Sequence, residues 1–300
     1  MRIKIGSRGS LLALWQARWV QDALHAEGVS SEIIIIKTSG DRLVDQPLAD
    51  LGGKGLFVKE IEEALIEEKI DLAVHSMKDL PAQLPPALVI AAVTAREDPR
   101  DAFISRSGAR LSALFAGARM GTSSLRRQAQ VLAYRPDLQC VPLRGNLDTR
   151  LRKLAEHHCD AVIVAAAGLC RMGWTERVTE YLSCEISLPA IGQGAIGLEC
   201  RMEDQKLRQQ LMKLNDTETA RCIQAERAML LKLEGGCHTP LAGYATHSPS
   251  DQTLTLRGRV ASPDGKTILC ETETGTDPEA VGYDLAERLL CRGARLLCRG

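Results

Sequence analysis

Aromatic residues are scarce in this sequence: tryptophan, tyrosine and phenylalanine together account for 3% of its 300 residues. Surfaces that bind single-stranded nucleic acids stack bases on aromatic side chains, so this scarcity argues against such a surface. The formal net charge is zero, which argues against indiscriminate binding to nucleic acids or to membranes. We therefore expect no nucleic-acid partner and no membrane partner.

Long apolar runs are also missing, and none approaches the length of a membrane span. Residues 1–6 lead directly into an expected strand and do not have the pattern of a signal peptide, so we expect a cytoplasmic protein. The ten cysteines form no Cys-x-x-Cys pair, so no disulfide framework and no metal site is predicted. Several are expected to be buried and unreactive: Cys200, Cys222, Cys270, Cys291 and Cys298.

The first third of the chain has the pattern of an α/β domain. Short apolar runs at residues 3–6, 32–37, 72–75 and 89–93 predict strands, and residues 11–26 have helical periodicity with Ser10 as a plausible N-cap. Between the first strand and this helix, residues 7–10 form a turn whose N–H groups and Arg8 suit an anion. A simple helix cap with a solvated Arg8 is an equally good interpretation.

Two further segments of this domain contain candidate functional residues. Asp79 follows the strand at 72–75, and ligands of parallel sheets collect beyond the carboxyl ends of strands. Its alternative role is to cap the turn before Pro81. Residues 51–57 open a helix to about Glu68, but their glycines and lysine do not have the spacing of a phosphate-binding loop, so no nucleotide site is predicted.

A second α/β unit follows residues 96–101, which are charged, contain a proline and are expected to form a linker. Residues 120–127 predict a strand, a polar turn and a helix with two arginines in its first turn. Arginine is unfavourable at the positive end of a helix dipole, which favours an anionic ligand there. Strands at 139–143 and 161–165 end beside further arginines, Arg144 and Arg171.

The rest of the chain predicts a return to the first domain and then a small α+β domain. Residues 188–200 are rich in glycine and apolar residues, as a returning chain would be. A helix at 217–233, capped by Asp216, is followed by a hairpin of strands 253–260 and 267–274 and by a final helix at about 278–297. Glycines and Pro240 place Cys237 on an exposed turn, where an isolated cysteine is more often only a small residue.

Together these features predict a cleft between two α/β domains, with a thiol offered from a third. Arginines, hydroxyls and one carboxylate would line this cleft. Since each arginine contact with a carboxylate contributes about 1.5–3 kcal/mol, several arginines imply a small ligand with many carboxylates or phosphates.

The motifs match those of a known family, in order, across nearly the whole chain. They lie at residues 8–16, 52–57, 75–81, 121–127, 143–146, 189–194 and 233–237, the last ending in Leu-Glu-Gly-Gly-Cys. In these stretches the sequence resembles the porphobilinogen deaminase family, also called hydroxymethylbilane synthases. Two positions depart from the pattern: Asp50 stands where some relatives carry lysine, and His238-Thr239 replaces Gln-Val.

The resemblance implies two α/β domains like those of type II periplasmic binding proteins, joined by two crossovers, and a small C-terminal α+β domain. Domain 1 would comprise residues 1–94 and 195–212, domain 2 residues 95–194 and domain 3 residues 213–300. A monomer is the expectation from the family.

The implied activity is the sequential condensation of four porphobilinogen molecules with loss of ammonia, followed by hydrolytic release of hydroxymethylbilane. A dipyrromethane cofactor would be bound covalently through Cys237, and Asp79 would stabilise the cationic pyrrole formed when ammonia leaves. Phe57 would pack on a pyrrole ring, although core packing explains it equally well. The residues expected to bind cofactor or substrate are Arg8, Ser10, Gln16, Lys54, Phe57, Ser76, Lys78, Thr122, Ser123, Ser124, Arg126, Arg127, Arg144, Gly145, Arg150, Arg171 and Gln193.

Two other hypotheses compete with this one. A non-enzymatic two-domain binding protein for a small polycarboxylate would explain the arginines but would leave Cys237 and the third domain without a role. A thiol-dependent hydrolase lacks a recognisable His-Asp pair near Cys237, apart from the adjacent His238.

Overall fold

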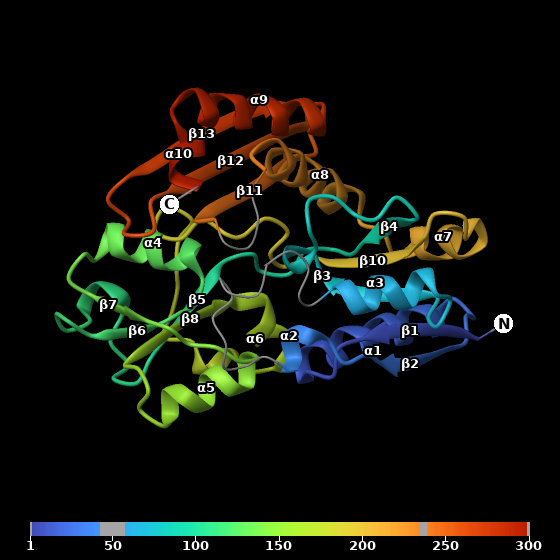
Figure 1. Cartoon of the computed structure of the whole chain (residues 1–300), viewed down its shortest axis with the longest axis horizontal. Helices are drawn as coiled ribbons and strands as arrows, with labels where there is room; N and C mark the ends of the chain where they lie inside the picture. The colour runs from blue at the N-terminus through green and yellow to red at the C-terminus, as the bar shows by residue number, and fades with distance from the viewer. Residues whose placement is uncertain (1, 43–57, 235–238, 299–300) are drawn as a thin grey trace. The chain divides into compact units, whose positions relative to one another are not determined.

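The computed structural model describes residues 2–42, 58–234 and 239–298. These residues form two compact units (Figure 1), the first made of residues 1–96 and 195–220 and the second of residues 97–194 and 221–300. Within the described residues, no helix combines the length and the apolar character needed to cross a bilayer.

The first unit is built on a five-stranded sheet with the order β2-β1-β3-β10-β4. Strand β1 pairs in parallel with β2 and β3, whereas β10 enters antiparallel between β3 and β4. The strands are β1 (Ile3–Ser7), β2 (Ser31–Ile35), β3 (Leu72–Ser76), β4 (Leu88–Val93) and β10 (Ile196–Arg201). The segment expected only to return to this domain therefore also supplies an inner strand.

Helices cover both faces of this sheet because alternate strand residues point to opposite sides. Leu72 and Val74 of β3 pack with α1 and α7, whereas Ala73 packs with α3. The helices are α1 (Leu11–Ala26), α2 (Ser39–Arg42), α3 (Lys59–Ile66) and α7 (Gln205–Leu211), with short 3₁₀ turns η2 (Met77–Asp79) and η5 (Met212–Leu214).

The second unit contains a sheet with the order β7-β6-β8-β5-β9. Its strands are β5 (Asp101–Ser105), β6 (Arg119–Gly121), β7 (Gln139–Val141), β8 (Ala161–Ala165) and β9 (Glu180–Tyr181). Strand β6 pairs in parallel with β7 and β8, and β5 lies antiparallel between β8 and β9. The helices and 3₁₀ turns of this part are η3 (Leu111–Ala113), α4 (Leu125–Tyr134), α5 (Leu147–Ala155), α6 (Ala166–Met172) and η4 (Thr175–Arg177).

The two five-stranded sheets have the same topology. In the first sheet β1 lies between β2 and β3, and in the second sheet β6 lies in the same way between β7 and β8. In each sheet one antiparallel strand, which follows a crossover, is inserted next to an edge strand: β10 beside β4 in the first and β5 beside β9 in the second. This agrees with the expected pair of α/β domains joined by two crossovers. The domain boundaries themselves stay a prediction.

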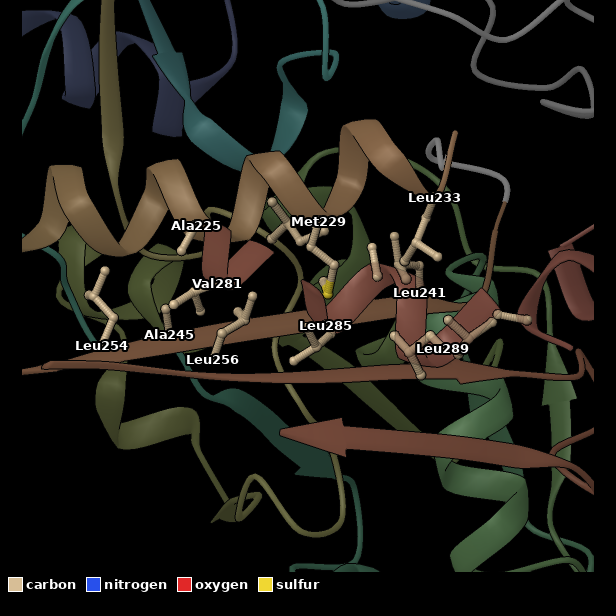
Figure 2. Close-up of a cluster of buried hydrophobic side chains, with 14 of the residues drawn as sticks. Ala225, Met229, Leu233, Leu241, Ala245, Leu254, Leu256, Val281, Leu285 and Leu289 are labelled. Atoms are coloured by element: carbon tan, nitrogen blue, oxygen red, sulfur yellow. The ribbon is translucent and has the colours of Figure 1, made fainter. Parts of the chain in front are cut away.

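A third, smaller sheet completes the second unit, with the order β11-β12-β13. Its strands are β11 (Leu241–Ser248), β12 (Thr253–Ala261) and β13 (Ile268–Gly275), and its helices are α8 (Thr217–Lys232), α9 (Pro278–Cys291) and α10 (Ala294–Cys298). Figure 2 shows side chains of α8 and α9 meeting those of β11 and β12 in one apolar core. The expected hairpin and the Asp216 cap, which accepts a hydrogen bond from Thr219 N at 2.8 Å, are confirmed.

Four predictions about local structure were wrong. Residues 96–101 do not end as a linker, because Asp101 begins β5 and is fully buried. The final helix is two helices, since Gly293 between them has a φ of 93° that breaks the helical path. Cys270 and Cys291 are exposed rather than buried. Cys200 and Cys222 are buried, as expected.

We predict that Leu285→Ala, in the centre of the apolar core of Figure 2, lowers the free energy of unfolding by about 2–5 kcal/mol because it leaves a cavity. Urea unfolding, monitored through the hydrogen exchange of residues 253–261, measures this loss. Leu296→Ala is the control, since Leu296 is 80% exposed and its truncation should change stability by less than about 0.5 kcal/mol. Equal losses in the two variants would contradict this description of the core.

Candidate active site

The end of β3 presents the candidate catalytic residue of the first unit. Ser76 ends the strand, Met77 is buried, and Lys78 and Asp79 are half-buried in the 3₁₀ turn that follows. The turn is closed by a hydrogen bond from Leu80 N to Met77 O. Asp79 is thus held on a short, anchored turn with part of its surface exposed, at the carboxyl end of a parallel strand.

Two predicted binding residues, Gln16 and Ser76, are hydrogen-bonded to each other at the strand end before this turn. Gln16, in α1, is only 3% exposed, and its Nε2 donates a hydrogen bond to Ser76 Oγ at 3.0 Å. The side chain of Gln16 therefore orients Ser76 from within the protein. Ser10 accepts a hydrogen bond from Ala13 N at 3.3 Å, which confirms it as the N-cap of α1, and Arg8 is half-buried nearby in the chain.

Three residues expected in the site lie outside the described residues: Lys54, Phe57 and Cys237. Asp50, one of the two departures from the family pattern, also lies there. Their assigned roles stay predictions.

In the second unit, the hydroxyls before α4 are bonded within the protein. Ser124 accepts from Arg127 N at 3.4 Å and caps the helix, and Thr122 Oγ1 accepts from Ser124 N at 3.1 Å. Ser123 Oγ both donates to Leu143 O and accepts from Leu143 N, each at 3.1 Å. These bonds fix the turn between β6 and α4 against the end of β7.

The two arginines of α4 are buried and converge on one carboxylate, Asp101 of β5. Arg126 donates to Asp101 Oδ2 at 2.9 Å, and Arg127 donates to Oδ1 at 2.7 Å through NH2 and at 3.1 Å through Nε. Asp101 has no exposed surface. Burial alone would raise the pKa of Asp101, but the charges of Arg126 and Arg127 outweigh it and hold that pKa well below its usual range.

Asp101 also joins the two crossover segments of this unit. Gln193 Nε2 donates to Asp101 Oδ1 at 2.9 Å and to Pro99 O at 2.7 Å, and Ser187 Oγ donates to Asp101 Oδ2 at 2.8 Å. Arg126 adds a bond to Leu188 O at 2.6 Å. The chain that enters the second sheet and the chain that leaves it are therefore bonded to the same carboxylate.

This arrangement changes the explanation of the paired arginines. From the sequence, their place at the positive end of a helix favoured an external anion, but Asp101 is an internal anion that balances both. The sequence argument missed it because residues 96–101 have the composition of a linker. A signal was present, since two adjacent arginines that become buried require a buried carboxylate from elsewhere in the chain. A binding role for Arg126, Arg127 and Gln193 stays a prediction.

Further cations follow the end of β7, in the turn before α5 and in α5 itself. Arg150 Nε donates to Gly145 O at 2.8 Å, and Arg144 O accepts from Lys153 Nζ at 3.2 Å. Gly145 has a φ of 113°, and a Cβ there would lie 2.5 Å from the side chain of Thr149, so only glycine fits this turn. Arg144 and Arg150 are half-buried on either side of it.

Arg171 lies in the last turn of α6 and contacts the return crossover. Its NH2 donates to Gly194 O at 2.6 Å. Burial lowers the pKa of Arg171 to about 10, with the charge of Glu97 opposing. The guanidinium remains charged near neutral pH.

The described candidate residues thus form two groups, one in each unit. The first comprises Arg8, Ser10, Gln16, Ser76, Lys78 and Asp79, and the second comprises Thr122, Ser123, Ser124, Arg126, Arg127, Arg144, Gly145, Arg150, Arg171 and Gln193. Within the described ranges, no three His, Cys, Asp or Glu side chains are arranged to hold a metal ion.

Comparisons with known proteins agree with the motifs. Residues 3–209 match the family model "Porphobilinogen deaminase, dipyromethane cofactor binding domain", and residues 220–291 match "Porphobilinogen deaminase, C-terminal domain". The porphobilinogen deaminase of Syntrophotalea carbinolica is 54% identical over 97% of this chain and 93% of its own length, and that of Geobacter metallireducens is 52% identical over 98% and 92%.

The chain belongs to the porphobilinogen deaminase family. Another member, from Bacillus thuringiensis, is also 54% identical, over 99% of this chain and 96% of its own length. Among solved structures, the methionine-binding protein MetQ is similar over 73% of this chain and 90% of its own, with 15% identity and a TM-score of 0.45. That likeness is too weak to support any argument.

The donor types found in the structure fit the dipyrromethane cofactor that the porphobilinogen deaminase family model names. Each ring of that group carries an acetate and a propionate, and the two groups of residues offer guanidinium, ammonium and hydroxyl donors, which pair well with carboxylates. The half-buried members suited to this are Arg8, Lys78, Arg144 and Arg150.

We predict that Asp101→Asn lowers the free energy of unfolding by about 3–5 kcal/mol, because it leaves two buried guanidinium charges without a counterion. Since the pKa of Asp101 is held below its value in the unfolded chain, this contribution is complete near pH 7 and is lost only as the pH falls far below 4. Chemical denaturation at pH 7 measures it.

The matched control is Asp98→Asn, which breaks a carboxylate–arginine pair with Arg100 whose side chains are 20% and 44% exposed. Exposed pairs contribute about 0–1 kcal/mol, so this variant should remain close to the original stability. A loss for Asp101→Asn no larger than that for Asp98→Asn would contradict the assigned role.

Proposed function

We propose that this chain catalyses the porphobilinogen deaminase reaction, also called hydroxymethylbilane synthesis. Four porphobilinogen molecules would be joined in turn to a covalent dipyrromethane primer. In each step a C–N bond of the substrate breaks, a C–C bond forms, and the proton displaced from the ring carbon balances the one that leaves with ammonia. Water would then release the linear tetrapyrrole. The observation that supports this best is the 52–54% identity to porphobilinogen deaminases over 97–98% of the chain.

We assign the fixed negative charge of the site to Asp79. When ammonia leaves the substrate, positive charge develops on its pyrrole ring, and a preoriented carboxylate lowers the energy of that charge. Its position on a short turn closed by a hydrogen bond supports this, since little reorganisation is needed. The carboxylate oxygens Oδ1 and Oδ2 are also suited to accept the proton displaced from the ring.

We assign the binding of acetate and propionate groups to the cations and hydroxyls of both units. Arg8, Lys78, Arg144 and Arg150 are half-buried, so their charges are partly desolvated and retain some exposed surface. Several charge-assisted contacts hold a reacting ring in one orientation, which lowers the entropic cost of each condensation. Ser10, Ser76 and the hydroxyls before α4 would add donors, as would Lys54 and Gln193.

We assign attachment of the primer to Cys237. The bound dipyrromethane supplies the free ring carbon to which the first substrate is joined. A thioether to Cys237 keeps every intermediate on the protein until release. The compartment, which we expect to be the cytoplasm, and the monomeric state stay predictions.

A non-enzymatic binding protein for a small polycarboxylate is the alternative. It is not favoured, because the matches to porphobilinogen deaminases continue through residues 220–291 and are not confined to the two α/β domains.

We predict that protein purified under mild conditions exceeds the mass of its sequence by two linked pyrrole units, and that Cys237→Ala removes this excess. Intact-mass spectrometry under denaturing conditions is the measurement. Cys270→Ala is the matched control, since Cys270 is an exposed cysteine elsewhere in the C-terminal part and its loss should leave the added mass in place. Added mass that persists in Cys237→Ala would refute the attachment site.

We predict that Asp79→Asn lowers kcat by about 10²–10⁴-fold, because it removes both the stabilising charge and the proton acceptor. Consumption of porphobilinogen, measured with a variant supplied with preformed primer, separates this effect from a failure of cofactor assembly. Asp284→Asn changes an exposed carboxylate of α9 and should retain full activity. Near-normal turnover by Asp79→Asn would remove Asp79 from this role.

A further inference from the structure

Two buried ionisable side chains are paired on the α3 face of the first sheet, and a third, on α3, interacts with them electrostatically; none of the three is among the residues assigned above. His75 of β3 and Glu199 of β10 are both buried, and the imidazole Nε2 lies 2.9 Å from Glu199 Oε2. They are diagonal neighbours, because His75 pairs with Gly197 and Glu199 pairs with Ala73. The carboxyl of Glu62, on α3, interacts electrostatically with both.

Two oxygens of this cluster lack a donor. Glu62 Oε1 and Glu199 Oε1 are buried and have no hydrogen-bond partner among the described residues. A buried acceptor without a donor is costly, so such atoms require an explanation. A proton on Glu62 supplies a donor and removes one of two like charges. In agreement, burial and then the charge of Glu199 raise the pKa of Glu62 to about 7, with His75 opposing.

The other charged residues on the elements packed against the cluster are either exposed or bonded elsewhere. Arg201 donates to Leu65 O at the end of α3 and pairs with Asp204 at 2.8 Å, and Glu60 accepts from Ser39 N. Strands β3 and β4 contain no ionisable side chain besides His75. The other charged residues on these elements are Lys59, Glu60 and Glu63 of α3, Arg201 of β10 and Lys4 of β1.

The cluster lies on one face of the strand end that presents Asp79. Ser76, the next residue after His75, points to the opposite face, where Gln16 is bonded to it. The sulfur of Met77 occupies the space that a Cβ on Gly197 would fill, 2.4 Å from its position. The end of β3 is therefore held on both faces immediately before Asp79.

We propose that Glu62, His75 and Glu199 form a positioning cluster for Asp79, in which a proton on Glu62 keeps the end of β3 fixed against β10 and α3. Loss of that proton leaves two buried carboxylates that repel each other and loosens this strand end. Turnover then depends on the protonation of a group that does not touch the substrate. The inference depends on the proposed function, because the cluster acts through Asp79.

The test compares pH profiles of kcat and KM for the unaltered protein, Glu62→Gln and Glu63→Gln. Glutamine is neutral at every pH and has the shape of protonated glutamic acid. The kcat of the unaltered protein should fall roughly tenfold between about pH 7 and pH 8.5, as the protonated fraction of Glu62 drops. Glu62→Gln should lack this fall and keep the original kcat near pH 6.5, with KM unchanged. Glu63→Gln, on the exposed side of α3, should retain the original profile.

Melting temperature between about pH 4.5 and pH 8.5 gives a readout that does not depend on activity. Because the pKa of Glu62 is raised from 4.5 to about 7 on folding, the folded state binds more protons in this interval, so stability should fall as the pH rises from about 4.5 to about 7 and level off above it. Glu62→Gln should lack this part of the fall. Glu199→Gln removes the repulsion between the two carboxylates, so it should also flatten the kcat profile. It should flatten the melting profile only in part, because burial, the larger cause of the raised pKa of Glu62, remains.

The outcomes separate two failures. Turnover with identical pH profiles in the unaltered protein and both cluster variants would overturn the positioning role, and so would a flattened melting profile with an unchanged kcat profile. No turnover by any form at any pH would instead refute the proposed function.

Discussion

A carboxylate with no exposed surface, Asp101, is bonded by two guanidinium groups, a serine hydroxyl and a glutamine amide. Removing such a group from water is costly, and the cost is offset only while all partners are in place. Since the carboxylate begins β5 and its partners come from α4 and from residues 187–193, this one ion cluster determines how the chain enters and leaves the second sheet. The helix that carries Arg126 and Arg127 is also bonded to the C-terminal sheet, because Arg259 donates to Gln130 Oε1 at 2.6 Å.

The same cluster divides the arginines into two kinds. Arg126 and Arg127 are buried, and an internal carboxylate balances them, so their charges stabilise the fold whatever else they contact. Arg144 is half-buried just after a short strand, as Arg8 and Lys78 are in the first unit, and Arg150 is half-buried in the helix that follows, α5. A growing ligand with many carboxylates requires half-buried cations such as these, whose exposed surface can reach the carboxylates on each ring. The structure therefore supports the proposed chemistry more through these residues than through the conspicuous Arg-Arg pair.

Sequence patterns predicted the strands and helix caps that depend on neighbouring residues. The strand at Ala161–Ala165 has the predicted bounds, and Asp216 caps α8 as expected, because burial of an apolar run and capping both depend on neighbouring residues. Strand β11 was missed, since its small and polar residues do not alternate clearly. Partners distant in the chain were also missed. His75 and Glu199 lie 124 positions apart, and the pairing of Asp101 with α4 requires a completed sheet, so no short motif reveals either.

The central claim is that the ligand grows as a covalent extension of the protein. Its most direct test is the intact mass of the protein after brief mixing with limited amounts of porphobilinogen, followed by acid quenching and denaturation. The account predicts a series of species that each add one porphobilinogen less one ammonia and that ends at four additions. Substrate consumption with a single, unchanged protein mass would contradict it.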